Sequence, residues 1–85
     1  MHYTYQPKGV CSMQIDFEIN GGIVSDVKFV GGCNGNLKAI GRLVEGKNAL
    51  EIAAVLEGNT CNSRSTSCAD QLSKALREAA AKEAV

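Results

Sequence analysis

Residues 11–20 alternate without a break between apolar and polar side chains. The apolar positions are Cys11, Met13, Ile15, Phe17 and Ile19, and every position between them is polar. Because successive side chains of a strand point to opposite faces, this period of two predicts a half-buried strand. Asn20-Gly21-Gly22 follows as a turn signal, and residues 23–30 are rich in β-branched side chains, so we expect an antiparallel hairpin.

The apolar residues of the two strands match best if the turn has three residues. The expected pairs are then Ile19 with Ile23, Ile15 with Val27, Met13 with Phe29, and Cys11 with Gly31. In this register Cys33 emerges at the same end of the hairpin as Cys11. Residues 2–5 are expected to add an edge strand before Pro7, a residue that suits a central strand poorly.

Three helices are expected after the hairpin. The first follows the glycine-rich bend at residues 31–35 and ends at Gly46, and the second runs from Asn48 to Gly58. The third covers about 68–84 and is capped by Thr66 or Ser67. The side chains expected to face inward are Leu37, Ile40, Leu43 and Val44, then Leu50, Ala53, Ala54 and Leu56, and finally Leu72, Ala75, Leu76 and Ala79.

The fold class expected from these elements is α+β: a hairpin-based antiparallel sheet of two or three strands packed against about three helices. With 85 residues, the chain has room for one domain over residues 1–85 and for a modest core. Nine basic side chains balance nine acidic ones, which argues against nucleic acid as a partner. The first residues do not resemble a signal peptide and no apolar run suits a membrane span, so we expect a cytoplasmic protein without a membrane partner.

The four cysteines are the strongest functional signal. Cys11 opens a strand, Cys33 lies in the glycine bend, Cys61 lies in a polar loop, and Cys68 falls in the first turn of a helix. A reducing cytosol disfavours a disulfide framework, and the positive end of a helix dipole favours the thiolate form that binds metals. The sequence therefore predicts one metal site formed by all four cysteines.

Three kinds of thiol site fit these residues. Four thiolates complete a tetrahedral zinc site, and the same ligands also suit an iron-sulfur cluster. A metal-free dithiol redox protein is the third alternative. We expect zinc.

The other polar candidates have ordinary explanations. Asp70 fits a first-turn carboxylate that complements the helix dipole. The alternatives are that it accepts a hydrogen bond beside the metal ligands without touching the ion, or that it is itself an oxygen ligand. Arg64 fits a surface cation, and Asp16 and Glu18 fit a solvated sheet face. His2 is the only histidine, and we assign it no role.

The segment Thr66-Ser67-Cys68-Ala69-Asp70, together with the glycine-rich residues 31–36, resembles the TSCPD domain family. The family is named for a Thr-Ser-Cys-Pro-Asp motif, and this chain has Ala69 in place of the proline. The likeness extends from about Cys11 to Leu76 and is closest to small stand-alone members with four cysteines.

TSCPD domains also occur at the C-terminal end of vitamin B12-dependent ribonucleotide reductases. The resemblance therefore implies a link to ribonucleotide reduction and DNA precursor synthesis, with a reductase as the expected partner. Reductase chemistry needs a large radical-bearing barrel, so a chain of 85 residues is expected to assist rather than to catalyse that reaction alone. The sequence predicts no oligomeric state.

A more distant resemblance is to the NifU-type iron-sulfur scaffold proteins. In that family a strand-opening cysteine, a Gly-Cys bend and a cysteine at the start of the last helix hold the cluster, and Cys11, Cys33 and Cys68 occur here in that order. The chain lacks the scaffold's aspartate after the first cysteine and its histidine before the last, where Ser67 stands. The resemblance implies a similar fold and keeps iron-sulfur assembly as the alternative function.

Overall fold

A computed structural model describes residues 1–8, 12–31, 34–59 and 66–84. The elements are strands β1 (His2–Tyr5), β2 (Ser12–Asn20) and β3 (Ile23–Gly31), followed by helices α1 (Asn34–Val44), α2 (Ala49–Leu56) and α3 (Cys68–Glu83). The strands form one antiparallel sheet in the order β1-β2-β3. The α+β class, the edge strand and the three helices are thus confirmed. None of the helices in the described ranges is both long enough and apolar enough to cross a membrane.

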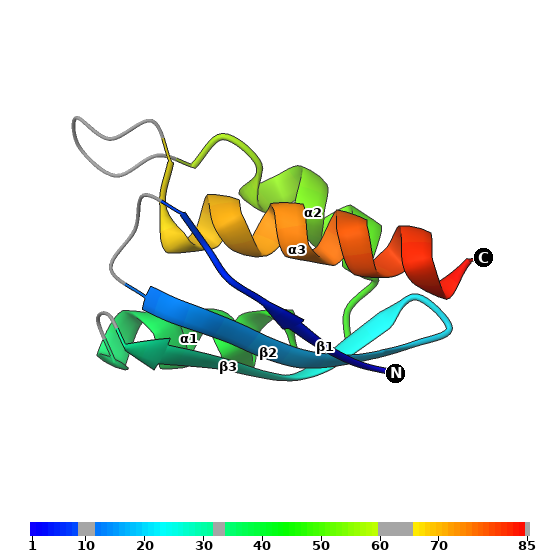
Figure 1. Ribbon diagram of the computed structural model, residues 1–85, viewed down its shortest axis with the longest axis horizontal. Helices are drawn as coiled ribbons and strands as arrows, with labels where there is room; N and C mark the ends of the chain where they lie inside the picture. Colours follow the sequence, from blue (N-terminus) through cyan, green and yellow to red (C-terminus); the bar gives the residue numbers. More distant parts are fainter. Residues whose placement is uncertain (9–11, 32–33, 60–65, 85) are drawn as a thin grey trace.

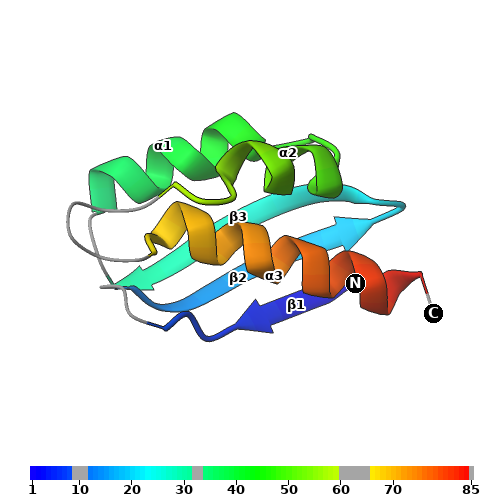
Figure 2. The same ribbon diagram turned by 90° about the horizontal axis from the view of Figure 1, so that it is seen from above.

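Two of the helices lie over one face of the sheet. In Figure 1, α3 lies above the strands and α2 lies beside it, and α3 packs on β2 while α2 packs on α3. Figure 2 shows α1 running alongside the β3 edge, which it contacts. A Cβ atom at Gly41 would lie 3.0 Å from the carbonyl oxygen of Val27. A glycine at this position of α1 therefore allows the helix to approach the edge of β3 closely.

The core lies between β2 and α3. Ile15, Phe17 and Ile19 of β2 are fully buried, as their alternation predicts. The predicted stripe of α3 is also confirmed, since Leu72, Ala75, Leu76 and Ala79 are all fully buried. The small alanine side chains in this stripe allow the helix to pack closely on its neighbours.

The expected hairpin register is wrong. Ile19 pairs with Val24 rather than Ile23, and Ile15 pairs with Phe29 rather than Val27. Phe29 is therefore not the partner of Met13. Gly31 pairs with Ser12 rather than Cys11. The first cause is the turn, because Gly21 and Gly22 have φ angles of 58° and 81° and form a two-residue loop. The second is a register shift in β3 beside Asp26, whose φ is 53°. A further shift between Ser12 and Gln14 sets the pair of Ser12 with Gly31.

Three side chains expected to face inward are exposed. Leu43 is 72% exposed, Leu50 is 52% exposed, and Ala54 is also exposed. Helix α2 instead buries Ala49 and Ala53, which lie on the same face one turn apart. Helix α2 therefore turns Ala49 and Ala53 to the core, with Ile52 and Leu56 partly buried against it, and leaves the larger Leu50 exposed.

The second half of α3 is fastened to the sheet by polar contacts. The Tyr3 hydroxyl of β1 donates a hydrogen bond to Glu78, and the Lys82 ammonium lies 5.2 Å from the centre of the Tyr3 ring. Farther along, the Glu83 carboxylate accepts hydrogen bonds from the backbone N–H groups of Gly21 and Gly22, each at 2.8 Å. These contacts fix α3 to β1 and to the turn between β2 and β3.

Candidate functional site

One of the four predicted metal ligands lies in the described part of the chain. Cys68 is the first residue of α3 and is half-buried. Cys11, Cys33 and Cys61 fall at positions 9–11, 32–33 and 60–65, outside the described residues. Within the ranges that are described, no group of three or more histidine, cysteine, aspartate or glutamate side chains is arranged to hold a metal ion.

The described residues next to the four cysteines lie at one end of the fold. Ser12, which follows Cys11, pairs with Gly31 at the end of β3. Figure 1 draws the start of β2, the end of β3, the start of α1 and the start of α3 on its left-hand side. The segment that contains Cys61 leaves from Asn59 and returns at Thr66, and the Ser67 hydroxyl donates a hydrogen bond to the Asn59 carbonyl.

The first turn of α3 is closed by a side-chain cap. Ser67 has extended backbone angles, and its Oγ accepts a hydrogen bond from the Asp70 N–H at 3.1 Å. This is the usual N-cap geometry, in which the cap satisfies one of the backbone donors that the helix leaves without a partner. Of the two predicted caps, Ser67 is therefore the one observed, and Cys68 takes the first helical position after it.

Asp70 is a buried carboxylate with hydrogen bonds to both of its oxygens. It is 6% exposed, its Oδ1 accepts from the Gly58 N–H at 2.8 Å, and its Oδ2 accepts from the Thr66 hydroxyl. The Lys74 ammonium lies 3.9 Å from Oδ2. The Thr66 hydrogen bond, followed by that from Gly58, holds the pKa of Asp70 below its ordinary value. Asp70 therefore links the end of α2 to the start of α3 as an anion.

Gln71 extends this network toward the segment that precedes β2. Its side chain is 4% exposed, its Nε2 donates to the Thr66 hydroxyl oxygen at 3.1 Å, and its Oε1 accepts from the Lys8 N–H at 3.0 Å. Every buried side-chain polar atom among the described residues has a hydrogen-bond partner. The network is thus fully satisfied, as a stable buried polar cluster requires.

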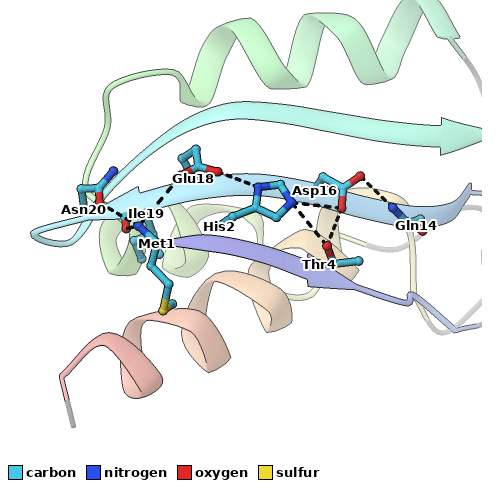
Figure 3. Close-up of polar contacts among 8 residues, drawn as sticks. All are labelled: Met1, His2, Thr4, Gln14, Asp16, Glu18, Ile19 and Asn20. Atoms are coloured by element: carbon cyan, nitrogen blue, oxygen red, sulfur yellow. Dashed lines mark hydrogen bonds and ion pairs between the residues drawn. The ribbon is translucent and has the colours of Figure 1, made fainter.

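A second polar cluster lies on β1 and β2 (Figure 3). His2 Nδ1 lies 2.6 Å from Glu18 Oε2, and His2 Nε2 lies 3.7 Å from Asp16 Oδ1. Asp16 also accepts hydrogen bonds from Thr4 at 2.7 Å and from Gln14 at 2.8 Å. The Thr4 hydrogen bond is the main cause of a lowered Asp16 pKa. These contacts join β1 to β2 across an exposed surface, so His2 has a structural role that the sequence did not indicate.

Part of the polar network at α3 was predictable from the sequence. Ser67 and Thr66 were cap candidates and Asp70 was expected in the first helical turn, whereas no role was expected for Gln71. The only sequence signal for Gln71 is a polar side chain directly before Leu72 in an apolar helix stripe. Arg64 lies outside the described residues, so its predicted surface position stays a prediction.

The family model of the TSCPD domain matches residues 3–80. The chain belongs to the TSCPD domain family. The match spans all four cysteines and the motif at residues 66–70. No curated protein and no solved structure is significantly similar to this TSCPD domain, so the resemblance to NifU-type scaffolds stays a prediction.

The cap geometry explains why the TSCPD motif tolerates Ala69. The fourth residue of the Thr-Ser-Cys-Pro-Asp motif is proline, and Ala69 occupies that position here, as the second residue of α3. Backbone N–H groups in the first turn of a helix have no intrahelical acceptor, so a proline there removes no helical hydrogen bond. Replacing it with alanine keeps the Ser67 cap and the Asp70 contacts that the motif supplies.

Proposed function

We propose that this TSCPD domain binds one zinc ion through Cys11, Cys33, Cys61 and Cys68, and that it acts as an accessory module linked to ribonucleotide reduction. The supporting observation is that the described residues next to all four cysteines lie at one end of the fold (Figure 1). Four thiol-bearing segments starting from one end require only short spans to reach a common ion.

The chemistry of the donor set favours zinc. Four cysteine thiolates match the closed tetrahedral coordination of structural zinc sites. The one described ligand, Cys68, stands at the positive end of a 16-residue helix, where a negative thiolate is favoured. A bound zinc ion would also stabilise a domain whose hydrophobic core is small.

The family membership supports the connection with ribonucleotide reductases. A domain of this size has no room for the radical-bearing barrel that reduces ribonucleotides, so we propose that it binds and supports the protein region that does. In this proposal a reductase is the partner, and the zinc ion holds the cysteine-bearing end of the domain in one conformation. The proposed location is the cytoplasm, where thiols stay reduced.

Elemental analysis with thiol titration tests the proposal directly, on protein purified anaerobically without chelator. We expect about one zinc per chain and four thiols that react slowly until the metal is removed. Iron with acid-labile sulfide would replace zinc binding with the iron-sulfur scaffold function. A metal-free protein that reversibly loses two thiols on mild oxidation would replace it with dithiol redox chemistry.

A further inference from the structure

The first turn of α3 and the residue before its N-cap bury more polar side chains than a helix cap needs. Thr66, Asp70 and Gln71 are 8%, 6% and 4% exposed, although they stand beside a fully apolar stripe. Burying polar groups is costly unless each finds a partner, and here each does. Ser67 alone already supplies the N-cap. The N-cap does not need Thr66, Asp70 and Gln71, so their burial requires another structural explanation.

Their partners are the described ends of two cysteine-bearing segments. Lys8, which donates its N–H to Gln71, is the last described residue before the segment with Cys11. Gly58, which donates its N–H to Asp70, stands two residues before the segment 60–65 that contains Cys61. Thr66 is the first described residue after that segment.

Gln71 is the connecting member of the network. Its amide joins the Lys8 N–H on one side to the Thr66 hydroxyl on the other, and Thr66 passes the connection on to Asp70. These hydrogen bonds thus join Lys8, Gly58 and Thr66 to the helical turn that begins with Cys68. A purely structural cap would involve α3 and the residues directly before it. This network instead reaches Lys8, which is 63 residues from Gln71 in the sequence.

We propose that Thr66, Asp70 and Gln71 are positioning residues of the cysteine site, which fix the segments on either side of Cys68 in the arrangement that binds the metal. The inference rests on the proposed zinc function and adds to it the residues that set metal affinity without touching the ion. Removing a residue that orients metal ligands without touching the ion typically weakens metal binding about 10–100-fold.

The test measures Co²⁺ and Zn²⁺ affinity by competition with a chromophoric chelator, together with the thiolate-to-cobalt charge-transfer band. Gln71→Ala is expected to weaken metal binding about tenfold or more and to alter the charge-transfer band, while the circular dichroism spectrum stays unchanged. Thr66→Val should act in the same direction. Thr66→Ser keeps the hydroxyl and should restore the wild-type affinity and band, which a loss of packing alone would not explain.

Ser73→Ala is the matched control. Ser73 is 1% exposed and donates its hydroxyl to the Asp70 carbonyl oxygen within α3, and no hydrogen bond joins its side chain to Lys8, Gly58 or Thr66 among the described residues. Its removal should lower the stability but leave metal affinity unchanged. If Gln71→Ala and Thr66→Val bind metal as tightly as Ser73→Ala, the positioning role is wrong although the zinc site stands. If the wild-type chain binds neither metal, the proposed function fails, and this inference fails with it.

Discussion

At the scale of single residues, the two tyrosines report on how α3 meets β1. Burial, followed by the hydrogen bond to Glu78, raises the pKa of Tyr3 to about 12, and burial is also the main cause of a raised Tyr5 pKa. The folded state therefore favours neutral Tyr3. This contribution to stability is complete below the ordinary pKa of 10 and is lost as the pH rises from 10 to 12.

Absorbance of tyrosinate measures this effect without interference, because the chain has two tyrosines and no tryptophan. We expect neither tyrosine of the folded protein to ionise at the ordinary midpoint and Tyr3 to ionise last, near pH 12. Glu78→Gln removes the negative charge and should move the Tyr3 midpoint downward. Complete ionisation of both tyrosines near pH 10 in the folded state would contradict the buried contact between Tyr3 and α3.

Asp70 shows what residue-level reasoning predicts and what it leaves out. A carboxylate three residues after a serine is a common helix start, so the position of Asp70 in the first turn of α3 was predictable. Its burial was not predictable, because it depends on Gly58 and Thr66, which approach from chain segments whose paths are set by tertiary packing. The same holds for Gln71 and its contact with Lys8.

At the scale of elements, the attachment of α3 to the hairpin turn has a measurable energy. Glu83→Ala removes an ionised acceptor from the Gly21 and Gly22 N–H groups and should lower the free energy of unfolding by about 1–2 kcal/mol. Urea denaturation measures the loss. The matched control is Glu57→Ala, because Glu57 forms an exposed ion pair with Arg77 at 3.2 Å and should cost at most about 1 kcal/mol. Equal losses for both variants would show that Glu83 contributes no more than a surface charge.

The elements themselves were predictable, but their pairing was not. The alternation of residues 11–20 and the apolar stripe of α3 each have one clear period, and both were confirmed in the described residues. The register failed because turn length and a bulge at Asp26 change the pairing without disturbing the alternation. The prediction that Leu50 faces inward was wrong for a related reason, since its exposure depends on which face of α2 meets α3.

At the scale of the whole molecule, the cysteine-bearing end is expected to depend on metal for its stability. If zinc binds only the folded chain, a concentration one hundredfold above the dissociation constant stabilises it by about 2.7 kcal/mol. A chelator should therefore lower the melting temperature, and added zinc should restore it. Differential scanning calorimetry measures the shift. A melting temperature that is the same with zinc and with chelator would contradict the proposed site.

Among the four proposed ligands, Cys61 stands in a polar stretch of the sequence that no periodic pattern assigns to a strand or a helix. We expect Cys61→Ser to reduce the zinc content and the melting temperature of the purified protein. A Cys61→Ser chain with full zinc content and unchanged melting temperature would remove this residue from the site. Such a result would leave Cys11, Cys33 and Cys68 as the three remaining thiol ligands.

X-ray absorption at the zinc edge of the anaerobically purified protein measures directly whether four cysteines hold one zinc ion. We expect a single shell of four sulfur atoms at about 2.3 Å from the zinc. A shell that contains nitrogen or oxygen ligands, or a protein that retains no zinc, would contradict it.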